Sequence, residues 1–283
     1  MSYGPWFDLL ISKMKNVHVD EIFVNGIKSL GILSSQKHEF FDSPFNDRLL
    51  MERAMQDFAF SFGLRLDPRS PFAGGFLDSV QYRWHCVLPP AAPEGPIFNL
   101  RKHRLSFLGL EHFGMTTDAQ KMVECLTNPR SSILICGETG SGKTSLLTAL
   151  LREMGINQRV ILLEEIAEIP LLGPLWARLL SRKIGLEQND IGYDTCMLFK
   201  ECLRLRPDRI VFGELRGTET QVFSHALSTG HVGLLATLHA GNIEDVRNIL
   251  QKYSSQLNGL SDLWVCFLQR GTPPVISAVV PWH

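Results

Sequence analysis

The architecture of this chain can be inferred from one segment, Gly137-Glu138-Thr139-Gly140-Ser141-Gly142-Lys143-Thr144, which matches the pattern G-x-x-x-x-G-K-[ST] in full. A short apolar run at residues 132–136 precedes the segment, and a stretch of helical character starts with Ser145-Leu146-Leu147 directly after it. Strand, glycine-rich loop and helix in this order are typical of a phosphate-binding loop. A glycine-rich turn that binds nothing is the alternative, and the strand and helix on either side disfavour it.

Each residue type in this loop suits the binding of a nucleoside triphosphate. Glycines let the backbone turn its N–H groups inward around an anion without a clash from Cβ. The N-terminus of the following helix adds partial positive charge. We expect Lys143 to reach the β- and γ-phosphates and the Thr144 hydroxyl to ligate Mg²⁺. The predicted ATP-binding residues of the loop are Gly137, Glu138, Thr139, Gly140, Ser141, Gly142, Lys143, Thr144 and Ser145.

Strands and helices are predicted to alternate around this loop. Apolar runs with the length of buried parallel strands occur at residues 132–136, 159–164, 209–213 and 234–238. Helices are expected at residues 118–127, 143–154, 195–205 and 219–228, and a last strand at 275–280. Such alternation predicts an α/β domain with a parallel sheet and right-handed crossovers over residues 117–283.

Residues 1–106 have a different pattern. Helices are expected at residues 7–14 and 45–62, and strands at 21–25, 29–33, 80–88 and 97–100. The Asn25-Gly26 pair predicts a turn between the first two strands. This mixture indicates a small α+β domain with an antiparallel sheet, joined to the second domain by a linker at residues 107–116.

Acidic residues stand at two strand ends of the predicted parallel sheet. Glu164 and Glu165 lie where α/β sheets place their ligands, so they could hold Mg²⁺ or its waters, and a solvated acidic turn is an equally good interpretation. Glu214 ends the next predicted strand, where it could orient or deprotonate an attacking water. Arg216 could neutralise charge on the γ-phosphate. An ordinary salt bridge at a strand end is the simpler alternative.

Two histidines bracket the strand predicted at residues 234–238. His231 stands before the strand in Thr-Gly-His, and His239 stands after it in Leu-His-Ala. A lone histidine is usually structural. Two that flank a strand of a sheet whose other strand ends face phosphate are better interpreted as γ-phosphate sensors or subunit-interface groups. No Cys or Asp lies at metal-ligand spacing from them.

Bulk properties favour a cytoplasmic protein. Hydrophobic residues make up 45% and charged residues 20% of the sequence, as in ordinary globular proteins. The 6 cysteines form no C-x-x-C pair and the start lacks the features of a signal peptide, which favours free thiols in a reducing compartment. The net charge of -1 and the lack of an aromatic-basic stripe argue against direct nucleic-acid binding. No apolar run is long enough to span a bilayer.

In order and spacing, these motifs resemble those of the type II/type IV secretion ATPase superfamily. The joint occurrence of the phosphate-binding loop, the acidic box, Gly-Glu-x-Arg and the histidine box is highly specific, and the resemblance covers residues from about 15 to 250. The segments Arg83-Trp84-His85-Cys86 and Leu100-Arg101-Lys102 are most similar to the tight-adherence (Flp pilus) and type IV secretion branch.

The resemblance implies a fold, an activity and an assembly. The fold is a C-terminal RecA-like domain preceded by a PAS-like α+β domain, and the activity is Mg²⁺-dependent ATP hydrolysis. Six subunits would form a ring, peripheral at the inner membrane, that acts on a platform protein of a pilus or secretion system. By motif match, Arg83 and Arg101 reach the phosphates from the N-terminal domain, whereas the residues alone would suggest ordinary surface charges. His231 and His239 would both belong to the nucleotide site.

The residues and the resemblance together predict that the catalytic residues are Glu214, Lys143, Arg216 and His239. Arg83, Arg101 and His231 add to the nucleotide-binding residues of the loop, and the metal ligands are Thr144, Glu164 and Glu165.

Three departures from the family pattern stand out. The acidic box reads Glu164-Glu165 where many relatives have Glu-Asp, and Gly241 replaces the usual Asn after His-Ala. Only 42 residues (283 minus 241) follow Gly241, which predicts an abbreviated C-terminal part. The tetracysteine zinc insertion of type II secretion and pilus-assembly ATPases is absent, which disfavours that branch.

The sequence therefore predicts a hexameric ATPase that powers a type IV pilus-like filament or a secretion system. One alternative is a nucleotide-gated regulatory or assembly module of the same machinery that hydrolyses little ATP. Another is a nucleic-acid motor with a similar core, which the charge distribution disfavours.

Overall fold

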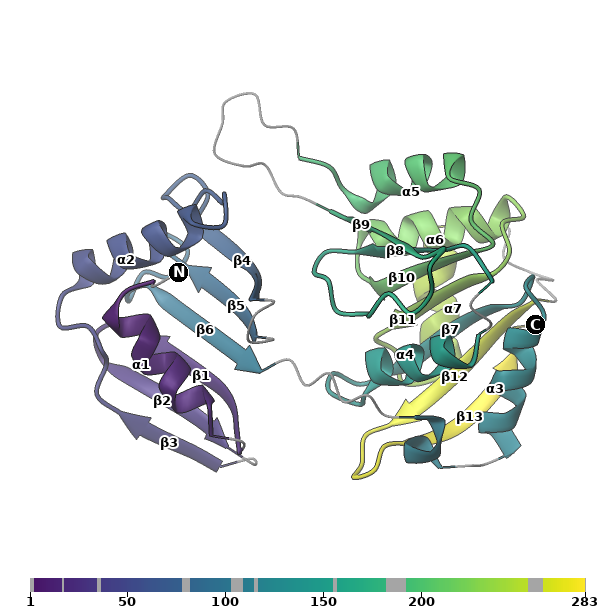
Figure 1. Cartoon of the computed structure of the whole chain (residues 1–283), viewed down its shortest axis with the longest axis horizontal. Coiled ribbons are helices and arrows are strands. Elements are labelled where there is room, and N and C mark those ends of the chain that lie inside the picture. Colours follow the sequence, from purple (N-terminus) through teal and green to yellow (C-terminus); the bar gives the residue numbers. More distant parts are fainter. Residues whose placement is uncertain are drawn as a thin grey trace. The chain divides into compact units, whose positions relative to one another are not determined.

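A computed structural model describes residues 3–16, 18–34, 37–77, 82–102, 109–114, 117–154, 157–181, 192–253 and 262–282. The chain divides into two compact units. The N-terminal unit is built mainly from Met1–Leu105, and the C-terminal unit from Ser106–Arg182 and Tyr193–His283. Each unit has its own sheet and its own buried side chains, and each is described separately (Figure 1).

The N-terminal unit is an antiparallel sheet with two helices. The helices are α1 (Pro5–Met14) and α2 (Arg48–Phe60); the strands are β1 (Val19–Asn25), β2 (Ser29–Ser34), β3 (Lys37–Phe41), β4 (Phe72–Leu77), β5 (Tyr82–Val87) and β6 (Ile97–Lys102). The strand order is β3-β2-β1-β6-β5-β4, and all neighbours are antiparallel. The predicted antiparallel sheet is confirmed, as is the turn at Gly26, whose φ of 59° lies in the left-handed region.

Helix α2 shows how the sequence builds this unit. The Asp47 side chain accepts a hydrogen bond from the Leu50 N–H and so caps the helix. Met51, Met55 and Phe58 recur at helical spacing and are buried against the sheet. The cap places the start of the helix at Arg48, three residues later than predicted, because an extended Asp47 cannot belong to the helix.

The C-terminal unit is a seven-stranded sheet with helices on both faces. Its strands are β7 (Ser132–Gly137), β8 (Val160–Glu164), β9 (Ala177–Leu180), β10 (Arg209–Leu215), β11 (Leu234–Leu238), β12 (Leu263–Gln269) and β13 (Val275–Pro281). Its helices are α3 (Thr117–Thr127), α4 (Lys143–Glu153), α5 (Thr195–Arg204), α6 (Thr218–Ser228) and α7 (Ile243–Gln251), with a 3₁₀ turn at Leu110–Phe113. The order is β13-β12-β7-β11-β10-β8-β9.

The four central strands predicted from the sequence, β7, β8, β10 and β11, are parallel, as expected. The predicted last strand is present as β13 but pairs antiparallel with β12, so the sheet is mixed rather than wholly parallel. Parallel strands β9 and β12 extend the sheet on either side. The predicted linker needs a correction, because Leu110 and Phe113 are buried in the core of the C-terminal unit.

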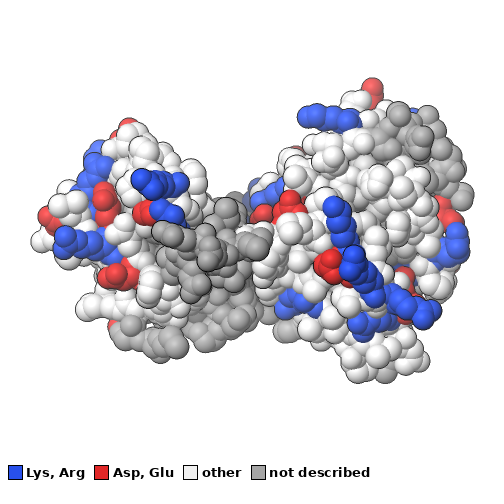
Figure 2. Space-filling view, turned by 90° about the horizontal axis from the view of Figure 1, so that it is seen from above, with Lys and Arg blue, Asp and Glu red and all other residues white. Residues whose placement is uncertain are grey.

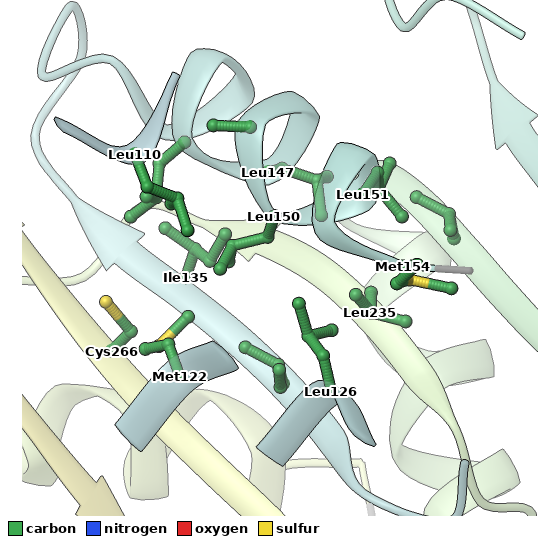
Figure 3. Close-up of a cluster of buried hydrophobic side chains, with 14 of the residues drawn as sticks. Leu110, Met122, Leu126, Ile135, Leu147, Leu150, Leu151, Met154, Leu235 and Cys266 are labelled. Atoms are coloured by element: carbon green, nitrogen blue, oxygen red, sulfur yellow. The ribbon is translucent and has the colours of Figure 1, made fainter. Parts of the chain in front are cut away.

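Two hydrophobic cores sandwich the sheet. On one face, α3 and α4 pack on β7, with Met122 and Leu126 of α3 and Leu150 of α4 around Ile135 (Figure 3). On the other face, side chains of α5, α6 and α7 cover the opposite sides of the same strands. Residues from both faces of β7 are fully buried, which explains its continuous apolar run. The ends of the strands are thereby held rigidly.

Arg209 lies at the N-terminal start of β10 and is fully buried. Its guanidinium donates hydrogen bonds to the carbonyl oxygens of Leu126, Asn128 and Ser131 at 2.7, 2.9 and 2.8 Å, and so satisfies carbonyls at and beyond the end of α3. Burial lowers the pKa of Arg209 to about 10, which leaves it charged at neutral pH. It supports the edge of the sheet opposite the phosphate-binding loop.

Candidate active site

The predicted phosphate-binding loop joins the end of β7 to the start of α4. Gly142 immediately precedes α4 with φ of 92°, a left-handed conformation that favours glycine. Gly137 is constrained by space, because a Cβ there would lie 2.5 Å from the Leu268 carbonyl oxygen of β12 and 2.7 Å from Ser141 Oγ. Since Gly142 supplies no side-chain cap to α4, the first backbone N–H groups of the helix are available to an anion.

Two polar side chains are buried in this loop. Lys143 Nζ donates to the carbonyl oxygens of Gly137 at 2.9 Å and Glu138 at 2.8 Å, which leaves one of its three protons for another acceptor. Ser141 Oγ is buried and has no hydrogen-bond partner within the structure. A buried hydroxyl without a partner is costly, and a phosphate oxygen would supply one. The loop therefore fits the phosphate chain of a nucleotide.

The electrostatics of Lys143 link the loop to β10. Burial lowers the pKa of Lys143, and the Glu214 carboxylate opposes this shift. Arg216 is also close enough to lower the pKa. The structure thus brings Lys143, Glu214 and Arg216, three of the predicted catalytic residues, into one electrostatic neighbourhood.

Glu214 lies at a bulge near the end of β10. The register with β11 passes from Phe212 opposite Ala236 to Leu215 opposite Leu238, so β10 has one extra residue at this point. Thr237 Oγ1 donates to the Gly213 carbonyl oxygen at 2.7 Å and fixes the bulge. The Glu214 side chain is partly exposed, and its Oε2 forms an ion pair with the Arg216 guanidinium, with 2.6 Å between the oxygen and the nearest nitrogen. A bulge of this kind re-aims a side chain at an active site.

The two predicted histidines lie at opposite edges of the sheet. His239 directly follows β11, is exposed, and lies at the edge where β7 enters the phosphate-binding loop, because Leu238 pairs with Cys136. His231 precedes β11, so the strand separates it from that edge by roughly 13 Å. Of the two predicted roles, γ-phosphate sensor or subunit-interface group, the first is therefore wrong for His231 with respect to the phosphate-binding loop of the same chain.

His231 has a structural environment instead. Its Nδ1 lies 3.1 Å from Thr229 Oγ1, and its ring packs edge-on against Phe199 at 5.8 Å. The other interpretation, a subunit-interface group, stays a prediction.

Glu164, predicted to ligate Mg²⁺, faces the protein interior. Its Oε1 accepts hydrogen bonds from the N–H groups of Glu168 and Ile169, each at 3.0 Å, and its Oε2 accepts one from Arg178 Nε at 2.7 Å. Burial raises the pKa of Glu164, and these donors lower it. This engagement corrects the metal-ligand prediction for Glu164.

Sequence reasoning missed Arg178, the partner of Glu164. Arg178 lies on β9, a four-residue edge strand whose sequence, Ala-Arg-Leu-Leu, is too short to show a periodic pattern. By contrast, the exposed Glu165 is not committed to this network.

A magnesium ion, which the loop chemistry implies, would find oxygen donors at this edge of the sheet. The hydroxyl of Thr144, in the first turn of α4, and the carboxylates of Glu165 and Glu214 are of the type that Mg²⁺ prefers. Within the described ranges no three His, Cys, Asp or Glu residues form a metal cluster. The residues fit an ion held chiefly through substrate phosphates, with one or two protein oxygens.

Arg83 and Arg101 belong to the N-terminal unit. They face each other as register partners on β5 and β6, so their side chains project from the same face of the sheet. Their predicted contact with phosphate stays a prediction.

Comparison with known proteins places the chain in a family. Residues 80–270 match the family model described as "Type II/IV secretion system protein". A putative conjugal transfer protein of Mycobacterium tuberculosis is 33% identical over 249 residues, which cover 84% of this chain and 66% of that protein. The type IV secretion system protein VirB11 of Brucella abortus is 38% identical over 113 residues, covering 40% of this chain and 31% of VirB11. The chain thus spans at most 66% of the length of these relatives.

Solved structures show the same fold. The ATPase DotB of Legionella pneumophila superposes with a TM-score of 0.65 at 16% identity, covering 93% of this chain and 76% of DotB. The pilus retraction motor PilT, solved with ADP, gives a TM-score of 0.62 at 16% identity, covering 92% of this chain and 77% of PilT. Since the family model matches most of the chain, including the phosphate-binding loop, Glu214 and both histidines, this protein belongs to the type II/IV secretion system protein family.

Proposed function

We propose that this protein is a Mg²⁺-dependent ATPase that works as a hexameric motor of a secretion system or a type IV pilus-like machine. One observation carries the proposal. Lys143, with one uncommitted proton, and the unpartnered Ser141 Oγ lie in a loop whose electrostatic neighbours are Glu214 and Arg216. Phosphate-binding groups and a carboxylate suited to activate water therefore lie at the same edge of the sheet.

The chemistry assigned to this edge is phosphoryl transfer to water. Glu214 orients the water and accepts its proton as the water oxygen bonds to the γ-phosphorus and the bond to the bridging oxygen of ADP breaks. Lys143 and the N-terminus of α4 stabilise charge on the phosphates. Mg²⁺, held by Thr144 and phosphate oxygens with Glu165 nearby, would neutralise part of that charge. His239, at the same edge, is suited to sense the γ-phosphate.

The Glu214–Arg216 ion pair suggests how ATP binding prepares the site for hydrolysis. Arg216 forms an ion pair with the carboxylate that must act as base. A γ-phosphate offers Arg216 a competing anion, so we assign Arg216 to the developing charge on that phosphate once ATP is bound. Glu214 is then freed for the water. Because the ion pair is half-exposed, breaking it so that Arg216 can move to the phosphate costs little free energy.

The family and the described roles of its members support a proposal about assembly. Conjugal transfer and type IV secretion proteins are among the relatives, and DotB and PilT share the fold. We propose a homohexamer at the cytoplasmic face of the inner membrane that moves a platform protein, with the tight-adherence branch and a PAS-like N-terminal domain as finer assignments. Every helix within the described residues is too short or too polar to cross a membrane. On the face drawn in Figure 2, acidic and basic side chains are interspersed in both units.

Phosphate release and mass test this proposal together. We expect steady ATP turnover that stops when Mg²⁺ is chelated, and a ring of about 191 kDa (six times 31.9 kDa) that forms with MgATP, because a ligand held at a subunit boundary favours the assembled state. Light scattering and a phosphate-release assay on the same sample measure both. A monomer that binds ATP without turnover at every concentration would support the regulatory module instead.

The arginines of the N-terminal unit give a second test. If Arg83 and Arg101 close onto the phosphates, replacing either with Ala should lower turnover by about 10- to 10³-fold, because each stabilises charge in a closed, water-poor site. The thermal midpoint without nucleotide should stay the same. Arg53→Ala, at an exposed position of α2, is the matched control. Wild-type turnover in both Arg83→Ala and Arg101→Ala would show that these residues are surface charges, worth no more than about half a kcal/mol.

A further inference from the structure

Glu164 and Arg178 form a buried network beneath the candidate active site. Arg178 Nε donates to Glu164 Oε2, and a second Arg178 nitrogen donates to the carbonyl oxygen of Ile169. The Glu164 side chain is 2% exposed and that of Arg178 22%, so the pair is largely removed from water. With the two backbone N–H groups on Oε1, the carboxylate is fully engaged. Such a network holds its members in one arrangement.

The network ties together three segments. Glu164 ends β8, Arg178 belongs to β9, and Ile169 lies in the loop between these strands, which starts at Glu165. The Ser181 N–H also donates to the Glu164 carbonyl oxygen at 2.9 Å, which extends the pairing of β8 with β9. The exposed Glu165 therefore starts a loop whose two ends are fixed through Glu164 and Arg178.

The same carboxylate supports the backbone beside Glu214. A Cβ at Gly213 would lie 3.2 Å from Glu164 Cγ and 3.6 Å from Oε1, so the Glu164 side chain packs directly on the Gly213 backbone. Gly213 stands at the bulge that aims Glu214, and Thr237 holds its carbonyl oxygen from the other side. A shift of the Glu164 side chain would therefore displace the Gly213 backbone and, with it, the adjacent Glu214.

We infer that Arg178 is a positioning residue for ATP hydrolysis, which acts through Glu164 on the bulge at Gly213 and so on the direction of Glu214. This inference rests on the proposed ATPase function. The hydrogen bonds given for Arg178 go to Glu164 and Ile169, neither of which belongs to the phosphate-binding loop, so its contribution would lie in turnover rather than in nucleotide binding. Without Arg178, Glu164 would be a buried carboxylate lacking its cation, which is unfavourable enough to move the side chain.

Replacing Arg178 with Gln tests the inference. We expect the turnover number to fall about 10- to 100-fold, the scale of a small misplacement of a catalytic group. The ATP concentration for half-maximal rate and the affinity for a fluorescent ADP analogue should change less than about threefold, since the phosphate-binding loop is untouched. Arg178→Lys keeps the positive charge but cannot donate to Glu164 and to the Ile169 carbonyl oxygen with the fixed geometry of a guanidinium. This variant should therefore recover only part of the lost turnover. Arg204→Gln removes an exposed arginine of α5 and serves as the matched control.

A double-mutant cycle with Glu164→Gln identifies the route. If Arg178 acts through Glu164, its loss should cost clearly less in the Glu164→Gln background than in the wild type, whereas independent sites would give additive losses. Additive losses, or wild-type turnover in Arg178→Gln and Arg178→Lys, would overturn the inference. If Arg178→Gln does not fold, Arg178→Lys carries the same comparison of turnover with nucleotide affinity. No hydrolysis by the wild-type chain under any condition would instead contradict the proposed function itself.

Discussion

Replacing Lys143 with Ala is expected to abolish ATP turnover and to weaken nucleotide binding beyond detection, while the fold survives. The ammonium group contacts two loop carbonyls and faces the position of the phosphates rather than the hydrophobic core. Keeping a charged group 8% exposed costs desolvation free energy, so its loss should not destabilise the ligand-free protein greatly. Phosphate release and binding of a fluorescent nucleotide measure the effect.

Thermal unfolding separates a binding defect from a folding defect. Nucleotide at 100 times its dissociation constant should stabilise the wild type by about 2.7 kcal/mol, and the Lys143→Ala variant should show no such shift while unfolding near the wild-type temperature without ligand. Lys121→Ala, which removes an exposed lysine paired with Asp118 on α3, should behave as the wild type in both respects. Near-wild-type hydrolysis by Lys143→Ala would disprove the assignment of the phosphate-binding loop.

The sequence was most informative where a local pattern and its context agree. The loop at Gly137–Thr144 has a complete motif between a strand and a helix, and the structure places those elements at the predicted residues. Buried parallel strands are also readable, because burial on both faces produces continuous apolar runs such as that of β7. Strand β12 has such a run, Leu-Trp-Val-Cys-Phe-Leu, and could have been predicted. The Asn242 cap of α7 was a second readable signal.

Other features depend on contacts that are distant in sequence. Nothing local to Arg178 shows that it pairs with Glu164, 14 residues earlier, because the pairing requires β9 to add beside β8. The buried Arg209 likewise contacts carbonyls about 80 residues away. Tertiary structure alone decides that Glu164 faces inward and that Glu165 stays exposed.

The position of His231 is a different case, because it follows from topology. In a parallel sheet, a residue that precedes one strand lies at the opposite edge from a loop that follows the neighbouring strand. His231 precedes β11 and the phosphate-binding loop follows β7, so the predicted strands alone already implied that the two are far apart. Motif membership grouped His231 with His239, although β11 lies between them. A motif can thus be correct as a family signature while its members occupy different places in one chain.

Glu214→Gln should leave ATP binding intact and slow hydrolysis by about 10²-fold or more, the usual scale for losing a general base. The substitution preserves the shape of the side chain but removes the charge that pairs with the Arg216 guanidinium, 2.6 Å from Oε2. It removes the carboxylate that raises the pKa of Lys143 and that would repel the triphosphate. ATP affinity should therefore stay the same or increase, and hydrolysis of bound ATP in a single turnover measures the chemical step directly.

Two comparisons fix the role of Glu214. Glu201→Gln removes an exposed carboxylate that also faces an arginine, Arg204, and should leave turnover unchanged. Arg216→Gln should slow hydrolysis if Arg216 stabilises the γ-phosphate, but should accelerate it if the ion pair merely restrains Glu214. If Glu214→Gln instead weakens MgATP binding and each bound ATP is hydrolysed at the wild-type rate, Glu214 serves Mg²⁺ or the structure of the bulge. In that event the base must be sought elsewhere on this edge, and the exposed Glu165 is the next carboxylate in position.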